Sequence, residues 1–431
     1  MRLEARDIAA PVALVLAAFG LSLGMIAGRA GSDLLFYVCA FAGAGIALVA
    51  GALVRGRRHP AVFVILVIGA ALIRIWFVTQ APTLSGDIYR YIWDGRVMNA
   101  GFNPYVHIPA DPALAPLRDP DQYNLIDKRN YAVTIYPPAA EALFALVTRV
   151  STARWAMKLT MVLFEAGAVL AIAHLMRSLG QRVEALVVYL LHPAPIWEIA
   201  GSGHLDAAMM ALLFGAFALA PRQGTPYRSA LLMTLAALIK PTAALGLPAL
   251  WRPPQLLLPL FVLAIALICY LPFLSAGAGV IGFLPNYAQE QGLDSGSGLY
   301  WLALLNQWAP LSPRIVWVYA AAAALLLLVL ALWLRRGGGF ELRGQLRGTA
   351  VLLIGFELML TPVLPWYWLA LLPFTPLLGL WCPFAFATGG FLLYGFNADA
   401  PPFFIRWSLL MGLVIFAIVR DALTARKGDQ R

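Results

Sequence analysis

The sequence has 431 residues, of which 61% are hydrophobic and 12% are charged, whereas a soluble globular domain carries roughly 25% charged residues. That composition excludes a soluble protein. Recurrent apolar runs of about twenty residues, the length that crosses a hydrocarbon core, predict an all-α polytopic membrane protein. The net charge of +10 comes from arginines spread over short connectors, so we expect no nucleic-acid partner.

Three apolar segments near the start of the chain are predicted to cross the membrane in turn. They are residues 8–28, 34–54 and 61–80. The first two form an N-terminal transmembrane hairpin, residues 1–58, ahead of a main module, residues 59–431. The basic stretch "RGRRHP" is expected on the cytoplasmic side, which places residues 82–155, where charges nearly balance, in a first external loop.

Further along, two segments are expected not to be ordinary spans. Residues 139–150 are predicted to be an amphipathic helix on the outer surface, because a crossing there would put the next arginines outside. Residues 229–250 are interrupted at Lys240-Pro241 and are read as two half-helices buried in protein. A second external loop covers 274–312. The other predicted spans are 156–176, 183–200, 205–220, 254–273, 313–334, 348–365, 367–381, 383–396 and 403–420. The total is roughly 12–14 transmembrane or half helices.

The stretch "SGDIYRYIWDGRVMNAGFNPY", residues 85–105, brings dense charge directly after the third span. It predicts a helix over 88–100, in which Arg90 and Asp94 are four residues apart and can pair. Its apolar positions are expected to lie against the bilayer: Ile88, Tyr91, Ile92 and Met98. Asp87, at the positive end of this helix, suits a general base or an anchor for a substrate hydroxyl. A plain helix cap has the same spacing, so both interpretations stay open.

Other polar groups are predicted to face the same side of the membrane. They are Tyr136, His204, Asp206, Trp366 and Tyr367. Lys240 is a further candidate, because an ionisable residue in an apolar segment is usually functional. The structural alternatives are a solvated histidine, an interfacial aromatic belt and a lysine that extends to the membrane surface.

Five blocks together resemble the GT-C superfamily of polytopic glycosyltransferases, and in particular the bacterial polyprenyl-phosphate-mannose-dependent mannosyltransferases. In order, they are "SGDIYRYIWDGRVMNAGFNPY", "IYPPAAEALF", "GSGHLDAAMMALL", "ALIKPTAALGLP" and "PWYWLALLPF". The first block is fairly specific, and the order of the others adds weight. One departure is that two spans precede the span leading to Asp87, where the family core usually begins.

The resemblance implies an inverting glycosyltransferase that moves a sugar, most readily mannose, from a polyprenyl-phosphate donor to an acceptor hydroxyl. The reaction would take place at the outer face of the inner membrane, with Asp87 as general base. The acceptor would be a glycan, lipid or glycolipid. No cofactor is implied, and no metal is required, because a monophosphate donor carries less charge than a diphosphate. The candidate substrate-binding residues are Tyr89, Arg90, Asp94, Arg96, Tyr136, His204, Asp206, Lys240, Trp366 and Tyr367.

Two other functions fit parts of the sequence. A secondary transporter or flippase of an envelope lipid or glycolipid would explain the helix broken at Lys240-Pro241. A third alternative is a noncatalytic assembly or polymerisation partner in envelope synthesis. Against a transporter, no inverted repeat is evident, and most polar residues are expected at one surface rather than at mid-membrane.

Overall fold

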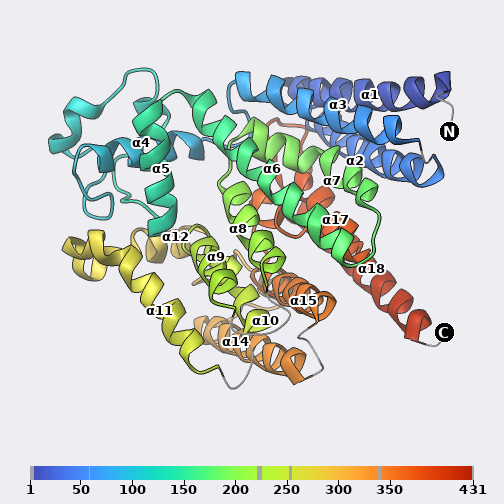
Figure 1. The fold of residues 1–431 in the computed structure, drawn as a ribbon. Helices are drawn as coiled ribbons and strands as arrows, with labels where there is room; N and C mark the ends of the chain where they lie inside the picture. The colour runs from blue at the N-terminus through green and yellow to red at the C-terminus, as the bar shows by residue number, and fades with distance from the viewer. Residues whose placement is uncertain (1–3, 58, 221–225, 252–254, 337–340, 430–431) are drawn as a thin grey trace. The chain divides into compact units, whose positions relative to one another are not determined.

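The computed structural model describes residues 4–57, 59–220, 226–251, 255–336 and 341–429. These residues form helices joined by loops, and the described part of the chain contains no strand (Figure 1). Seven described helices are long and apolar enough to cross a membrane, or eight if one bent pair counts as a span. A helix satisfies its own backbone hydrogen bonds, as a lipid surrounding requires. The predicted all-α polytopic membrane fold is confirmed.

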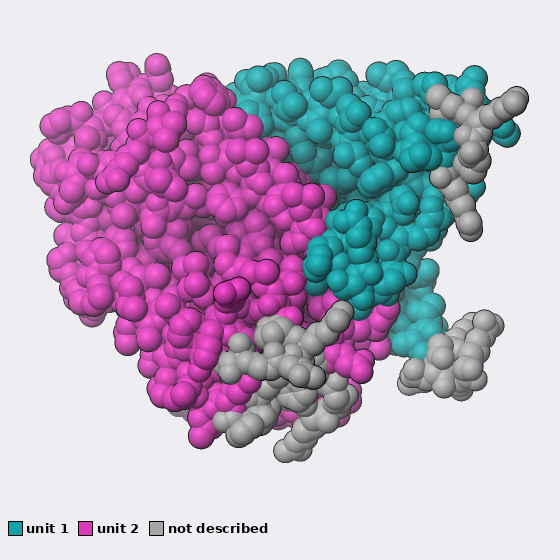
Figure 2. Space-filling view, in the orientation of Figure 1, with its two compact units in different colours: residues 1–83, 172–201, 363–431 teal, residues 84–171, 202–362 magenta. Residues whose placement is uncertain are grey.

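The chain divides into two compact units (Figure 2). Unit 1 consists of Met1–Thr83, Ile172–Gly201 and Val363–Arg431, and unit 2 consists of Leu84–Ala171 and Ser202–Pro362. This division does not follow the boundary expected near residue 58. The N-terminal hairpin belongs to unit 1 together with the third span and the C-terminal part of the chain.

Unit 1 is built mainly from the two ends of the chain. Its elements are α1 (Ala5–Gly31), α2 (Asp33–Gly56), α3 (Pro60–Thr79), η3 (Val183–Leu186), α7 (Val187–Leu190), η4 (Pro195–Gly201), η7 (Pro365–Trp368), α16 (Phe374–Leu378), α17 (Cys382–Gly389), η8 (Gly390–Leu393) and α18 (Phe403–Asp429). Helices α1, α2, α3 and α18 confirm four predicted spans. The span predicted at 183–200 is a bent pair of helices with an angle of 69°. The span predicted at 367–381 is wrong, because that region consists of short pieces separated by turns. The span predicted at 383–396 corresponds to a shorter apolar helical stretch, Cys382–Leu393, in which α17 continues directly into η8.

A network that we call the terminal clamp fixes the N-terminal hairpin to the C-terminal part of unit 1. Asp33 is fully buried and accepts hydrogen bonds from the backbone N–H groups of Phe396, at 3.0 Å, and Asn397, at 2.7 Å. In the opposite direction, the carboxylate of Asp399 accepts hydrogen bonds from the Ser32 hydroxyl, at 2.7 Å, and from the backbone N–H of Asp33, at 3.0 Å. Carboxylates bonded to backbone N–H groups in this way hold chain segments that are far apart in sequence.

Unit 2 carries the broken helix and the short helices of the predicted external loops. Its elements are α4 (Asp87–Asn99), η1 (Pro112–Leu117), η2 (Tyr123–Leu125), α5 (Pro138–Val150), α6 (Arg154–Ser178, which continues into unit 1), α8 (Asp206–Ala218), α9 (Tyr227–Ala237), η5 (Pro241–Gly246), α10 (Leu247–Leu250), α11 (Leu257–Tyr270), η6 (Leu271–Ile281), α12 (Leu284–Glu290), α13 (Tyr300–Asn306), α14 (Pro313–Arg336) and α15 (Leu342–Leu360). The predicted interruption at Lys240-Pro241 is confirmed by the gap between α9 and η5. The span predicted at 205–220 is the shorter helix α8.

Helices α4 and α5 pack tightly against each other. Tyr91 of α4 stacks on Phe144 of α5, with ring centroids 4.6 Å apart. Gly95 allows the close approach, since a Cβ there would lie 2.4 Å from the carbonyl oxygen of Phe144. Ile88 and Ile92 are also buried. The prediction that the apolar side of this helix faces lipid is therefore wrong, because that side packs on protein.

Candidate active site

The first carboxylate of the predicted site, Asp87, is the first residue of α4. Its backbone N–H donates to the Ser85 hydroxyl at 3.2 Å, and Gly86 is the N-cap residue. The side chain remains 34% exposed. The helix N-terminus favours a negative charge at this position, and the carboxylate can still be reached from solvent.

His204 lies directly behind Asp87, on the segment between η4 and α8. Its Nδ1 atom is 3.9 Å from Oδ2 of Asp87, and its side chain is 1% exposed. Gly203 adopts a positive φ of 80°, and a Cβ there would lie 2.9 Å from the side chain of Ile88. Glycine thus lets this segment run close against α4. A separation of 3.9 Å between these two atoms is too long for a direct hydrogen bond.

The surroundings of Asp87 raise the pKa of its carboxyl group above the ordinary value. Burial among protein atoms is the largest cause, and the nearby His204 opposes it. The negative charge of Asp127 raises the pKa further, while Lys240 lowers it. A carboxylate with a raised pKa binds a proton more readily than a solvated aspartate, which favours proton acceptance during a reaction.

Lys240 and Asp206 form a buried ion pair in unit 2. The Nζ atom of Lys240 is 2.6 Å from Oδ1 of Asp206, and the two side chains are 11% and 2% exposed. Lys240 precedes the break between α9 and η5, and Asp206 is the first residue of α8. The Leu238 carbonyl also accepts the backbone N–H of Ala139 at 3.1 Å, which joins the end of α9 to the start of α5. Lys240 therefore points to a carboxylate in the protein and not to the membrane surface.

Two tyrosines complete the group near Asp87. The ring of Tyr136 meets that of Tyr91 edge to face, with centroids 5.0 Å apart. Burial, and secondly the charge of Asp87, raises the pKa of both hydroxyl groups well above the usual value. Both phenols therefore keep their protons and can donate hydrogen bonds in the neighbourhood of the carboxylate.

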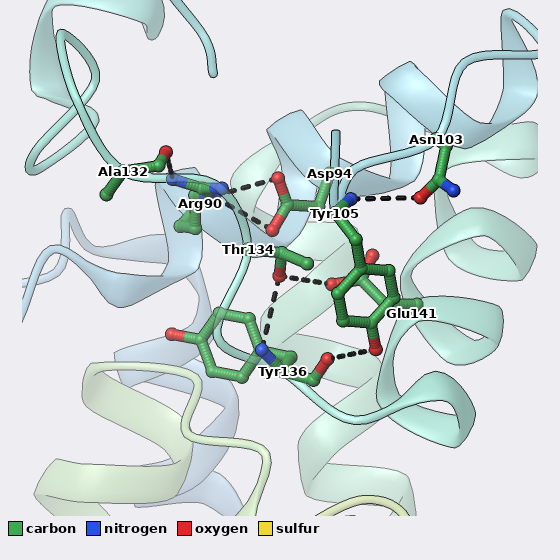
Figure 3. Close-up of polar contacts among 8 residues, drawn as sticks. All are labelled: Arg90, Asp94, Asn103, Tyr105, Ala132, Thr134, Tyr136 and Glu141. Atoms are coloured by element: carbon green, nitrogen blue, oxygen red, sulfur yellow. Dashed lines mark hydrogen bonds and ion pairs between the residues drawn. The ribbon is translucent and has the colours of Figure 1, made fainter. Parts of the chain in front are cut away.

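A second polar group joins α4, α5 and the segment before α5 (Figure 3). We call Arg90, Asp94, Thr134 and Glu141 the carboxyl cluster. Nε of Arg90 lies 2.8 Å from both oxygens of Asp94, which confirms the predicted pairing, and Nη1 donates to the Ala132 carbonyl at 3.0 Å. The Thr134 hydroxyl donates to Oε1 of Glu141 at 2.5 Å. Because Asp94 is 1% exposed, its carboxylate is engaged within the protein.

The remaining predicted site residues have other contacts. The hydroxyl of Tyr89 accepts a hydrogen bond from Nη1 of Arg154 at 3.1 Å. The guanidinium of Arg96 lies 3.6 Å from the carboxylate of Asp119. Trp366 and Tyr367 belong to η7 in unit 1, where their rings stack with centroids 6.4 Å apart. The structure thus groups Asp87, Tyr136, His204, Asp206 and Lys240, with Arg90 and Asp94 in the adjoining carboxyl cluster.

The sequence analysis missed two buried residues of this region. Glu141 is fully buried, although it lies in the block "IYPPAAEALF"; a carboxylate on the apolar side of an amphipathic helix was its signal. Lys158 of α6 is also fully buried, and its Cγ would be 3.2 Å from a Cβ at Gly203. Among the described residues, no three His, Cys, Asp or Glu side chains are grouped as a metal site would need.

The chain is a polytopic helical membrane protein, and an exposed carboxylate lies at the start of a short helix outside its spans. This arrangement is typical of an integral-membrane glycosyltransferase. Residues 12–252 match the family model described as "Alpha-(1->6)-mannopyranosyltransferase, N-terminal domain" of the MptA_B family. The match covers more than half of the chain, so the protein belongs to this mannosyltransferase family. Neither a curated protein nor a solved structure matches the chain. The resemblance to GT-C mannosyltransferases and the predicted enzyme class are confirmed.

Proposed function

We propose that the protein is an inverting mannosyltransferase that uses a polyprenyl-phosphate mannose donor, with Asp87 as the general base. The exposure of neighbouring carboxyl groups carries this assignment. Asp87 is 34% exposed, whereas Asp94 and Asp206 are each 1% exposed and Glu141 is fully buried. A general base must come within hydrogen-bond reach of the proton that it takes, and of these four groups Asp87 is the one that a substrate can approach.

In the proposed reaction, an acceptor hydroxyl attacks the anomeric carbon of the mannose. Its proton passes to the Asp87 carboxylate, and the bond to the phosphate oxygen breaks, so that the lipid phosphate leaves with the electron pair. A single displacement inverts the anomeric centre, and a β-linked donor then gives an α-linked product. The α-(1→6) linkage in the family description supports this outcome, and we propose a sugar 6-hydroxyl as the acceptor group.

The leaving phosphate needs cationic or hydrogen-bonding groups on the side opposite to the base. The loop that carries Lys128 and Arg129 is close to the start of α4, because the carbonyl oxygen of Leu125 is 3.7 Å from a Cβ placed on Gly86. Lys128 keeps 23% of its side chain exposed while paired with Glu290. We assign phosphate binding to this loop, since Arg90 is buried and paired with Asp94, and His204 is buried.

The donor assignment is tested with purified protein and a series of donors. Polyprenyl-phosphate mannose, glucose and arabinose and a nucleotide-linked mannose are each supplied with a mannoside acceptor, and the products are identified by mass and linkage. We expect turnover with the lipid-phosphate mannose and none with the nucleotide sugar. Direct turnover of the nucleotide sugar would contradict the proposed donor.

We also propose that the site faces the exterior of the cytoplasmic membrane. The basic connectors support this orientation by the positive-inside rule. In a variant lacking native cysteines, a cysteine at Asp127, which is exposed, should react with an impermeant thiol reagent on intact cells. Cysteines at the exposed positions Arg228 and Arg343 should react only after permeabilisation, and labelling of either from outside would reverse the proposed orientation.

A further inference from the structure

The carboxyl cluster contains two carboxyl groups but a single arginine. Asp94 and Arg90 neutralise each other through both oxygens of the carboxylate. Glu141 faces the same cluster, is fully buried, and accepts a hydrogen bond from Thr134 on Oε1. Its Oε2 atom is also buried and, among the described residues, accepts no geometric hydrogen bond. An ionised Glu141 would therefore place a second negative charge beside Arg90, whose charge Asp94 already balances.

A buried carboxyl group without a compensating cation favours its neutral form. Burial is the main reason that the pKa of Glu141 is raised well above the ordinary value, and the charge of Asp94 adds to it. The hydrogen bond from the Thr134 hydroxyl opposes this rise in pKa but does not outweigh burial. The hydroxyl donates to Oε1, which leaves Oε2 as the oxygen that carries the proton.

Thr134 connects this protonated group to several segments of unit 2. Its hydroxyl oxygen accepts the backbone N–H of Tyr136 at 3.2 Å. Its carbonyl oxygen accepts the backbone N–H of Phe283 at 2.9 Å, and its own N–H donates to the Pro104 carbonyl at 3.0 Å. Figure 3 also shows the Tyr105 hydroxyl donating to the Tyr136 carbonyl, at 2.6 Å. The position of Tyr136 is thus fixed from both its N–H and its C=O.

We propose that Glu141 is a positioning residue that carries a proton in the working enzyme and, through Thr134, holds Tyr136 in register with Asp87 at the start of α4. Its kinetic consequences rest on the proposed function. When Glu141 loses its proton at alkaline pH, two carboxylates share one arginine, and their repulsion separates α5 from α4. This gives the enzyme an alkaline loss of activity that does not involve the titration of Asp87.

The groups that face Glu141 are known from each neighbouring element. Helix α4 supplies Arg90 and Asp94, and the segments before α5 supply Thr134 and Tyr105. Tyr270, at the end of α11, acts on Tyr105. Burial raises the pKa of the Tyr105 hydroxyl, so this group keeps its proton while Glu141 titrates. The alkaline transition therefore belongs to Glu141.

The kinetic test compares Glu141→Gln with Glu141→Ala. Glutamine reproduces the shape and neutrality of the protonated acid, so we expect kcat and KM close to those of the unmodified enzyme, without the alkaline loss of activity. Alanine removes the partner of Thr134 and should lower kcat by about a hundredfold with a smaller change in KM, as a misplaced catalytic group does. A Glu141→Gln variant as inactive as Asp87→Asn would overturn the proposal, because it would make Glu141 an ionised participant.

Two measurements decide the protonation state without turnover. The infrared spectrum of the unmodified protein at neutral pH should contain the carbonyl band of a buried protonated carboxylic acid, and this band should be missing in Glu141→Gln. Because the folded protein binds a proton that the unfolded chain has lost, stability should fall as pH rises from 4.5, the ordinary value, towards the raised pKa of the folded state. Glu141→Gln should lack that slope. An absent band overturns the proposal, whereas a missing turnover with an intact band overturns only the proposed function.

Discussion

Asp33 in unit 1 and Asp87 in unit 2 begin their helices in the same way, but the exposure of their side chains differs. Each is the first helical residue of its element and follows a serine closely. Asp33 is fully buried and bonded to the backbone N–H groups of Phe396 and Asn397. Asp87 is 34% exposed and has His204 at 3.9 Å.

The difference shows that a helix-start motif determines local structure but not the use of the carboxylate. The oxygens of Asp33 are held by N–H donors that are fixed in the fold, so this carboxylate serves as a structural link. Asp87 has the buried imidazole of His204 on one side and remains partly exposed to solvent. An exposed carboxylate is available to a substrate proton, and the following changes test that contrast.

The largest effect is expected from Asp87→Asn. Asparagine keeps the size of the side chain and begins a helix about as well as aspartate, but it cannot accept a proton. Positioned acid–base groups contribute roughly 10² to 10⁴ in rate, so kcat should fall by at least about a hundredfold. Donor binding and thermal stability should be retained, and both are measurable on purified protein.

Asp33→Asn is the matched control, because it makes the same chemical change at the equivalent position of α2. It should leave turnover per folded molecule nearly unchanged. Near-normal turnover of Asp87→Asn would mean that Asp87 only begins its helix, as Asp33 does.

The next largest effect, on stability, is expected from Lys240→Met. The change leaves Asp206 as a buried charge without its cation, and breaking a buried pair from one side costs about 3–5 kcal/mol. The double variant Lys240→Met/Asp206→Leu should recover much of this loss, since it removes both charges. Denaturant or thermal unfolding of the three proteins gives the comparison. A double variant as unstable as the single one would show that the pair matters through something other than charge compensation.

A smaller loss of stability is expected from Asp33→Ala in the terminal clamp. The backbone N–H groups of Phe396 and Asn397 lose their acceptor, and each buried unsatisfied group costs about 1–3 kcal/mol. The midpoint of thermal unfolding should fall, while turnover per folded molecule stays the same. A loss of kcat in the stable fraction would instead tie the clamp to catalysis.

The fold was largely predictable because its determinants are local. Apolar length identified α1, α2, α3, α6 and α14, and Lys240-Pro241 marked a true break in the chain. The C-terminal region from 367 to 396 was not predictable from apolar composition. Turns separate the short helices before residue 382, and the helical stretch from 382 to 393 is too short to be a full span.

The candidate site was predictable in its residues but not in its contacts. Charge density identified Asp87, and polar residues in apolar surroundings identified His204 and Lys240. The pairing of Lys240 with Asp206 depends on how the break after α9 approaches the start of α8, and sequence spacing does not contain that information. Glu141 was missed because a glutamate in an amphipathic helix is usually solvated, and only the packing against α4 buries it.

The smallest expected effect concerns the pH dependence of the reaction, which the charge of Asp127 near Asp87 should shift. Asp127 is exposed, and its negative charge raises the pKa of Asp87. A general base must be ionised, so kcat/KM should fall as pH drops through that pKa. Asp127→Asn removes the repulsion, lowers the pKa of Asp87, and should move this acid limb to lower pH without changing the plateau rate.

The shift should shrink at high ionic strength, because salt screens an exposed charge. Asp111→Asn, which removes a surface carboxylate paired with His107 instead, should leave the limb in place. An acid limb that Asp127→Asn does not move at low salt would show that the group titrating there is not Asp87.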